Sequence, residues 1–151
     1  MRYFLDTEFN GFGGELISIG LVPEFGDQEY YAVVPFAGPP HPWVARNVLP
    51  YLDSVPQSLN NRIDAVTAAH EVAAFLGGDR DPVIVADWPE DIALFCRLLL
   101  VGPADIVDVG SLRFEFRRSP GFSTAMNSRV PHNALHDARA LRDFVLDAED
   151  R

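Results

Sequence analysis

Apolar residues at the start of the chain fall into three short runs that are separated by turn-forming segments. The runs cover residues 2–9, 16–22 and 29–34, and each has the length of a strand. A glycine-rich segment over 10–14 separates the first two runs, and Glu-Phe-Gly-Asp over 24–27 separates the next two. Glycine and aspartate favour tight turns, so this part of the chain predicts a three-stranded antiparallel meander.

The rest of the chain alternates between helical and extended patterns. Alanine, valine and leucine at helical spacing predict a helix over 64–76, followed by a Gly-Gly stop signal. An evenly apolar run over 82–86 predicts a strand that is buried on both faces. The remaining predicted elements are helices over 43–52 (interrupted by Pro50), 91–101, 111–118 and 133–148, a strand over 106–109, and a loop over 119–131.

This order of elements predicts the fold class. Strands come first and helices then alternate with short strands, which is typical of an α/β protein with a mixed sheet. We therefore expect the antiparallel meander to be joined by parallel strands, with helices flanking the sheet. The 151 residues contain neither an internal repeat nor a linker, so we expect a single domain over 1–151.

Composition and charge narrow the class of protein. No apolar stretch approaches the ~20 residues of a membrane span, and Asp6 lies where a signal peptide needs its apolar stretch. We expect a cytoplasmic protein without a membrane partner. The net charge of −10 argues against a protein that coats nucleic acid, because such proteins carry an excess of Lys and Arg. The single cysteine, Cys96, lies among leucine and phenylalanine, and we expect it to be buried and reduced.

Asp6 and Glu8, at the end of the first predicted strand, are the first candidates for chemistry. Side chains alternate faces along a strand, so these two carboxylates point the same way and Thr7 points the other way. Adjacent carboxylates repel unless a cation lies between them, and their hard oxygens suit Mg²⁺ or Mn²⁺. Such pairs also occur as solvated surface charge, but the position after a buried strand favours a metal site.

The start of the last predicted helix adds a histidine and another carboxylate. His132 and Asp137 are five residues apart, which is about 500° around a helix, so they do not share one helical face. We infer that His132 lies in the loop or first turn and that Asp137 lies inside the helix. This spacing suits a base above the metals better than a metal ligand. His136 is rotated about 100° from Asp137, and we expect it to be structural, like His41 and His70.

The third carboxylate of the site is either Asp87 or Asp91. Both lie between the predicted strand over 82–86 and the helix that follows it. In open α/β sheets, ligands bind at the loops that follow the carboxyl ends of parallel strands. Asp91 has a second interpretation, as a carboxylate that stabilises the N-terminus of its own helix. On these local grounds the choice stays open.

Together these residues describe the chemistry of a two-metal phosphodiesterase. Two divalent ions, about 4 Å apart in such sites, clamp the attacking and leaving oxygens of the phosphodiester. The carboxylates expected to hold them are those of Asp6, Glu8, Asp91 and Asp137. His132 removes the proton from the attacking water, which typically contributes a factor of roughly 10² to 10⁴ in rate. An unperturbed histidine, with a pKa of about 6.5, is mostly neutral at pH 7–8.

Aromatic and basic side chains are candidates for substrate contacts. The candidates are Phe9, Phe12 and Trp88 beside the carboxylates, and Arg113 and Arg117 in the only basic segment of the chain, over 113–129. The aromatic rings suit stacking on terminal bases, and packing in the core or a loop is the competing interpretation. The arginines suit the phosphates of a single strand, or else a solvated helix face.

Two motifs of the chain resemble those of the DEDDh 3′-5′ exonucleases, the group that contains ribonuclease T and oligoribonuclease. DTEF, over 6–9, is similar to their first motif. HNALHDA, over 132–138, is similar to their third motif, H-x-A-x-x-D. This resemblance places the base at His132 and the fourth carboxylate at Asp137.

A middle motif follows in the expected order, with a departure. The family pattern is N-x-x-F-D before a helix, and alignment on the helix places its Asp at Asp91 and its Asn at Asp87, with Glu90 in place of Phe. This departure is why Asp91 is a less firm match than the other carboxylates. The segments MRYFLDTEF, ELISIG and WVARNVLPYL also look like a compact actinobacterial branch of ribonuclease-T-like exoribonucleases.

The resemblance implies a ribonuclease-H-like fold, two Mg²⁺ or Mn²⁺ ions per active site, and release of 5′-nucleotides one at a time from a 3′ end. It also implies that the protein is often a homodimer. We expect single-stranded nucleic acid as the partner, RNA rather than DNA. The alternatives are the same chemistry on DNA, a phosphodiesterase for small nucleotides, and a non-catalytic nucleic-acid-binding module with the same fold.

Overall fold

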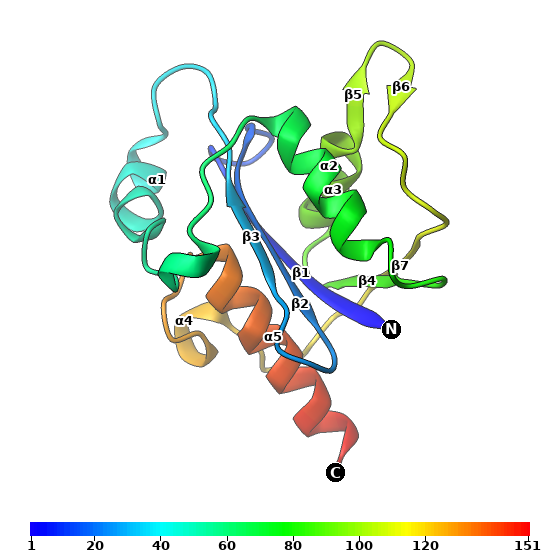
Figure 1. Cartoon of the computed structure of the whole chain (residues 1–151). Coiled ribbons are helices and arrows are strands. Elements are labelled where there is room, and N and C mark those ends of the chain that lie inside the picture. Colours follow the sequence, from blue (N-terminus) through cyan, green and yellow to red (C-terminus); the bar gives the residue numbers. More distant parts are fainter.

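The computed structural model describes residues 1–151 and contains a five-stranded mixed sheet with helices on both faces (Figure 1). In sheet order the strands are β3 (Tyr30–Val33), β2 (Leu16–Pro23), β1 (Arg2–Phe9), β4 (Val83–Ala86) and β7 (Arg113–Phe116). The first three strands in the sequence are antiparallel, and β4 and β7 run parallel to β1. The predicted α/β class, with an antiparallel meander joined by parallel strands, is confirmed.

Helices cover the sheet on each side. One layer consists of α2 (Ala65–Leu76) and α3 (Pro89–Leu98). The other layer contains α5 (Ala134–Glu149), together with α1 (Pro42–Asn47), the 3₁₀ turns Leu49–Tyr51 and Gln57–Leu59, and the short α4 (Thr124–Asn127). None of the helices combines the length and the apolar character that a membrane crossing requires.

Strand β1 is central because its side chains are buried on both faces. Tyr3 and Leu5 belong to the core on the side of α2 and α3. Phe4 packs on the opposite side, with Leu141 and Val145 of α5. Even-numbered positions of β1 therefore face α5, and odd-numbered positions face α2 and α3. This alternation continues beyond the core and decides which way the polar residues at the end of β1 point.

The helix predicted over 64–76 is confirmed, and its ends follow the expected chemistry. Asp64 is the N-cap and accepts a hydrogen bond from the Thr67 N–H at 2.9 Å. Gly77 takes the C-cap position. A helix predicted over 91–101 begins two residues earlier and ends at Leu98.

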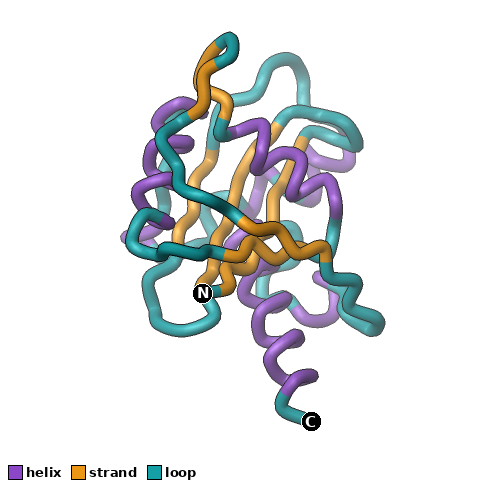
Figure 2. The backbone as a smooth tube through the Cα atoms, turned by 90° about the vertical axis from the view of Figure 1, so that its right-hand side faces the viewer, coloured by secondary structure: helices purple, strands orange, loops and turns teal.

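Four local predictions were wrong. Residues 111–118 contain strand β7 rather than a helix, because apolar and polar side chains alternate there with a period of two. The strand predicted over 106–109 is limited to β6 (Asp105–Ile106), which pairs with β5 (Leu100–Gly102) in a separate hairpin at the top of Figure 2. The loop predicted over 119–131 contains α4. Cys96 is exposed, because the buried face of α3 passes through Phe95 instead.

Candidate metal centre and active site

Strand β1 places Asp6 and Glu8 together on the face that α5 covers. Glu8 is buried, and Asp6 is half-buried with its Oδ2 atom buried and without a hydrogen-bond partner. The pairing of β1 with β4 reaches only to Phe4, so both carboxylates lie beyond the end of the neighbouring parallel strand. This is the edge of an open α/β sheet at which ligands bind.

Helix α5 brings Asp137 to the same place. Its N-cap is Asn133, whose side chain accepts hydrogen bonds from the Leu135 and His136 N–H groups and donates to the Tyr51 carbonyl at 2.9 Å. Asp137 lies in the first turn and is almost fully buried. Its Oδ2 accepts from the His132 N–H at 3.0 Å, and its Oδ1 is buried without a partner.

Gly20 allows α5 to come this close to the sheet. It lies opposite Asp6 in the β1–β2 pairing. A Cβ atom at this position would be 2.5 Å from the Ala134 carbonyl oxygen, at the start of α5. Only glycine fits such a backbone contact, so the separation between Asp6 and Asp137 depends on this residue.

His132 lies two residues before the start of α5, close to the carboxylates of Glu8 and Asp137. It has a left-handed backbone with φ of 64°, a conformation that non-glycine residues adopt mainly at turns and functional sites. Its ring contacts Trp43 of α1 edge-on, with 4.8 Å between the ring centroids. A ring nitrogen of His132 and one carboxylate oxygen each from Glu8 and Asp137 lie within 4.8 Å of one another. Half-burial lowers the pKa of His132, which favours the neutral ring.

Asp91 reaches the cluster from the first turn of α3, on the other face of β1. It is buried, and its Oδ1 accepts hydrogen bonds from the Thr7 backbone N–H at 3.2 Å and the Thr7 hydroxyl at 2.6 Å. Burial raises the pKa of Asp91 to about 7, although these hydrogen bonds oppose the shift. Thr7 points away from Asp6 and Glu8, as the strand pattern predicts, and on that side of β1 it holds the Asp91 carboxylate in place.

Asp87 lies in the loop after β4 and also faces the cluster. It is half-buried, and burial raises its pKa. Asp91 and Asp87 both raise the pKa of Asp6, and Asp91 has the larger effect. Asp91 therefore acts on the Asp6 carboxylate more strongly than Asp87 does, and both belong to the same electrostatic cluster.

The cluster is strongly unfavourable as a set of free anions. Burial raises the pKa of Asp6 and of Glu8 well above the usual range, and the neighbouring carboxylates raise both further. Burial also raises the pKa of Asp137 to about 6, although the nearby Ser128 hydroxyl and the His132 N–H favour its charged form. None of the ion pairs in the structure involves these carboxylates.

These features fit a divalent cation. The unpartnered oxygens of Asp6 and Asp137 are buried acceptors, which an ion would satisfy. Glu8, His132 and Asp137 place three donor atoms at metal-binding separation. His132 can therefore serve either as a ligand or as a base, whereas its spacing from Asp137 in the sequence favoured a base over a ligand.

Exposed aromatic side chains lie on the two loops that follow β1 and β4. The rings of Phe12, in the β1–β2 loop, and Trp88, in the β4–α3 loop, have centroids 6.5 Å apart. Phe12 is 88% exposed and Trp88 is 48% exposed, so neither ring is a core residue. The Gly13 N–H donates to Glu90 Oε1 at 2.6 Å and ties the two loops together. Phe9 is half-buried at the end of β1.

Arg113 and Arg117, the predicted substrate-binding arginines, form ion pairs away from the candidate site. Arg113, at the start of β7, pairs with Asp81. Arg117 pairs with Glu149 at 2.6 Å, and Glu149 lies about 18 Å along α5 from Asp137. The structure does not bring either guanidinium to the carboxylates.

Three residues at the site were not predicted as part of it, namely Thr7, Gly20 and Trp43. For Thr7 alone the sequence gave an indication, because side chains alternate along a strand and Thr7 must therefore point to the face opposite Asp6 and Glu8. Nothing in the sequence links Trp43 to a histidine that is 89 residues away.

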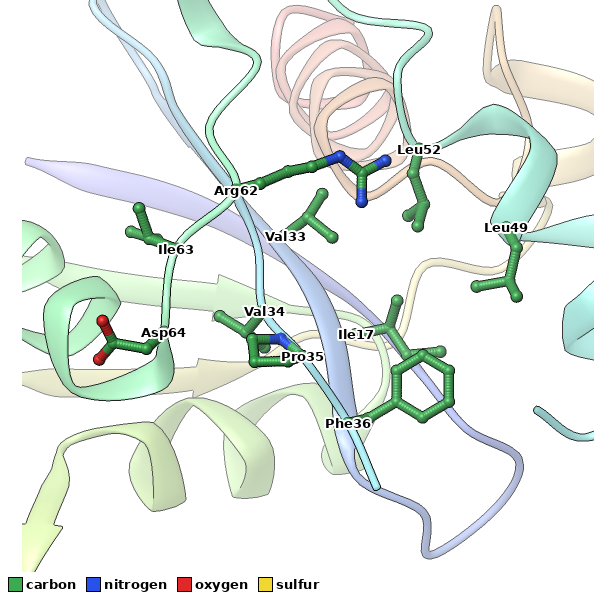
Figure 3. Close-up of a pocket in the computed structure, with 10 residues that line it drawn as sticks. All are labelled: Ile17, Val33, Val34, Pro35, Phe36, Leu49, Leu52, Arg62, Ile63 and Asp64. Carbon is green, nitrogen blue, oxygen red and sulfur yellow. The ribbon is translucent and has the colours of Figure 1, made fainter. Parts of the chain in front are cut away.

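A separate cavity of about 630 Å³ lies beyond β3, away from these residues (Figure 3). Its lining is mostly apolar and includes Ile17, Val33, Phe36 and Leu49, with Arg62 and Asp64 as its charged members. None of the candidate site residues lines it.

A scan against models of known protein families and a search of curated proteins both found no match to this chain.

Proposed function

We propose that the chain is a divalent-metal-dependent 3′-5′ exoribonuclease of the DEDDh type, with a ribonuclease-H-like fold. The observation that carries the proposal is the convergence of four carboxylates and one histidine from three distant segments. Asp6 and Glu8 come from β1, Asp91 from α3, and His132 and Asp137 from the start of α5. No cation of the protein balances them, which supports a site that is completed by metal.

The carboxylates suit two Mg²⁺ or Mn²⁺ ions better than softer metals, because every acidic ligand offers hard oxygen. When bound, such ions stabilise the charge on the attacking and leaving oxygens of a phosphodiester. The unpartnered oxygens of Asp6 and Asp137 would contact them directly. Asp91 is oriented through Thr7, so its remaining oxygen is the one available to the site.

His132 is proposed as the general base. A neutral ring nitrogen accepts a proton from the water that attacks phosphorus, while the 3′ oxygen of the preceding nucleotide leaves. Trp43 restricts the orientation of the ring, and the bond from the His132 N–H to Asp137 holds the backbone in its left-handed conformation. The lowered pKa keeps the ring competent at neutral pH.

Phe12 and Trp88 are proposed to hold the terminal base. Stacking of a base on an aromatic ring is worth about 1–3 kcal/mol and tolerates every base. Both rings are exposed and close to each other, on the loops that follow β1 and β4, which suits a single-stranded end. A duplex would meet an acidic surface, because the chain carries a net charge of −10.

The proposal is tested with two oligomers of one sequence, RNA and DNA, each labelled at the 5′ end and incubated with Mn²⁺. A ladder that shortens from the 3′ end of the RNA, and that EDTA blocks, is the expected result. A ladder from DNA alone would assign the same chemistry to the other sugar. Binding of Mn²⁺ without cleavage of either oligomer would contradict an enzyme and favour a binding module.

A further inference from the structure

The first residue after β1, Asn10, is bound to a segment that lies far from it in the sequence. Its side-chain N–H donates to the Pro39 carbonyl at 3.1 Å, and its Oδ1 accepts from the His41 N–H at 2.7 Å. The nitrogen and the oxygen of the amide are therefore both used by the connector that precedes α1. Because Asn10 lies two residues beyond Glu8, these bonds join the strand that carries the carboxylates to the start of α1.

His41 carries this connection into the helix. It is the N-cap of α1, and its Nδ1 atom accepts a hydrogen bond from the Trp43 N–H at 3.3 Å. A helix of six residues is not stable by itself in water, so the first turn of α1 depends on this cap and on packing. The orientation of Trp43 in that turn is thus tied to Asn10.

Trp43 passes the connection on to His132. The two rings meet edge-on, with 4.8 Å between their centroids, and Trp43 is 43% exposed, so core packing holds its ring only in part. The left-handed backbone of His132 persists only where the surroundings hold it. The bond from its N–H to Asp137 restrains that backbone, so the direction of the imidazole depends on Trp43.

The other end of the α1 segment is fixed to α5 instead of to β1. Two side chains at the start of α5 form hydrogen bonds to the Tyr51 and Ser54 carbonyls, at 2.9 and 2.8 Å. Residues 41–54 are therefore held by α5 at one end and by β1 at the other. Loss of the Asn10 bonds would free the end that carries Trp43 while the α5 end stays in place.

We propose that Asn10 is a positioning residue for the general base, His132. Through the contacts of His41 and Trp43, its amide sets the direction of the imidazole. This inference rests on the proposed function, because it assigns a role within that reaction. A base must lie within hydrogen-bond reach of the water that it deprotonates, and a displacement of about 1 Å can cost about 10²-fold in rate. Asn10 is not one of the proposed metal ligands, so its removal should affect the rate more than metal binding.

Single-turnover cleavage of RNA at saturating Mn²⁺ tests this role through combined substitutions. We expect Asn10→Ala to lower the rate about tenfold or more, while calorimetry finds the Mn²⁺ dissociation constant unchanged within about twofold. In a His132→Ala background, Asn10→Ala should have no further effect, because no imidazole is left to position. In a Trp43→Ala background it should add little, since the effects of residues that act through one another are not additive.

Three results would overturn the proposal. They are a normal rate in Asn10→Ala, an equal fall in rate when Asn10→Ala is added to His132→Ala, and additive effects of Asn10→Ala and Trp43→Ala. The matched control is Asn60→Ala, which removes an exposed asparagine whose side chain donates to Asp53, and we expect a normal rate from it.

The NMR signals of the His132 imidazole, identified by their loss in His132→Ala, give a readout that needs no cleavage. An aromatic ring shifts the signals of the protons beside it, so a change in the Trp43 contact is visible in EDTA at one pH. Asn10→Ala should move these signals and leave those of His70, in α2, unchanged. Unmoved His132 signals overturn the proposal. If the unaltered chain cleaves neither RNA nor DNA, the proposed function fails, and these signals still show whether Asn10 orients the ring.

Discussion

At the scale of single residues, the candidate site depends on buried carboxylates that have no basic partner. Asp6 and Asp137 each keep one buried oxygen without a hydrogen bond. Leaving such acceptors unsatisfied is costly, and the cost is highest when the groups are charged. The arrangement is therefore stable only when protons or cations occupy it, and this dependence is measurable.

Substitution should separate the role of Asp6 from that of His132. Asp6→Ala removes a carboxylate from the centre of the cluster, so we expect loss of both Mn²⁺ binding and turnover. His132→Ala leaves every carboxylate in place, so we expect kcat to fall roughly 10²- to 10⁴-fold with more metal binding retained. Calorimetry of Mn²⁺ binding and single-turnover cleavage of RNA measure the two effects.

His136→Ala is the matched control for this comparison. Its ring lies 2.8 Å from the Ser54 carbonyl and does not belong to the Glu8–His132–Asp137 group. We expect near-normal turnover from this variant. Near-normal turnover from His132→Ala and Asp6→Ala as well would contradict the proposed site.

The metal-free protein should lose stability as pH rises. Burial raises the pKa of Asp91 to about 7 and that of Asp137 to about 6, while unfolded aspartate has a pKa of about 3.9. Between these values the folded state binds more protons than the unfolded state, so the free energy of unfolding falls as pH rises from about 4 to 7. Thermal unfolding in EDTA across this range measures the slope.

Added Mn²⁺ should reverse this trend. The ion competes with protons for the same oxygens, so the gain in Tm should be small near pH 5 and larger near pH 8. Asp137→Asn removes one of the titrating groups and should flatten the slope in EDTA. A Tm in EDTA that rises with pH over the window would contradict the electrostatic account of the cluster.

At the scale of elements, the site is assembled where β2 and α5 touch. Gly20 brings the Ala134 carbonyl of α5 against the sheet directly opposite Asp6. Asn133 caps the helix and bonds to the Tyr51 carbonyl, which fixes the helix end relative to the segment after α1. The position of Asp137 thus follows from the docking of a whole helix, not from the local sequence around it.

Gly20→Ala should disturb the site through this contact. The new methyl group would lie 2.5 Å from a backbone carbonyl that cannot rotate away, so α5 must shift. We expect a loss of about 1–3 kcal/mol in the free energy of unfolding and weaker Mn²⁺ binding. Gly78→Ala is the matched control, because an added Cβ there meets nothing within 4 Å. Equal stability and metal affinity in the two variants would show that α5 does not depend on the contact.

At the scale of the whole molecule, the first strand and the end of the last helix are joined by one arginine. The Arg2 guanidinium donates to both carboxylate oxygens of Glu149, each at 2.8 Å, and also pairs with Glu24. Arg117 of the β7 side pairs with Glu149 as well. These bonds connect the start of β1, the end of α5 and the residue after β7. They lie at the end of β1 opposite to Asp6 and Glu8.

Glu149→Gln should weaken the fold in a pH-dependent way. Hydrogen bonds from Arg2 lower the pKa of Glu149 to about 2. A lowered pKa stabilises the fold above the unfolded value of about 4.3, and this contribution is lost as pH falls toward 2. We expect a deficit of roughly 0.2–1 kcal/mol at pH 7, since the pair is partly exposed, and none near pH 2.

Urea unfolding of the two proteins at several pH values measures this difference. Asp150→Asn is the control, because its exposed side chain joins no ion pair. A deficit in Glu149→Gln that persists unchanged to pH 2 would assign the effect to packing instead of charge.

Local periodicity was sufficient wherever neighbours in the sequence decide the structure. The meander, the helix over Ala65–Leu76 and the shared face of Asp6 and Glu8 follow from alternation, capping and turn chemistry alone. Strand β7 carries the same kind of signal, since its apolar and polar residues alternate with a period of two. The helix predicted there follows only from its content of Arg and Phe, and composition is a weaker signal than periodicity.

Partners that are distant in the sequence were decided only by the tertiary structure. Asp91 joins the site through Thr7, on a different face of β1 from Asp6, and its helix position gave no sign of this bond. Arg113 and Arg117 were candidates for contacts with substrate phosphates or for a solvated helix face, but β7 directs them to Asp81 and Glu149. Which charged side chains pair depends on how the helices and strands pack together, and local sequence patterns do not contain this information.

The sequence by itself determined the three-stranded meander, the strand over 82–86, the main helices and the residue types that suit a divalent metal, because these depend on periodicity and donor chemistry. Only the tertiary structure decided that Gly20 admits α5, that Trp43 packs against His132 and that one edge of the sheet stays open. Each of these is a contact between elements far apart in the chain. Their geometry is set by how the layers pack, and packing is a property of the assembled core.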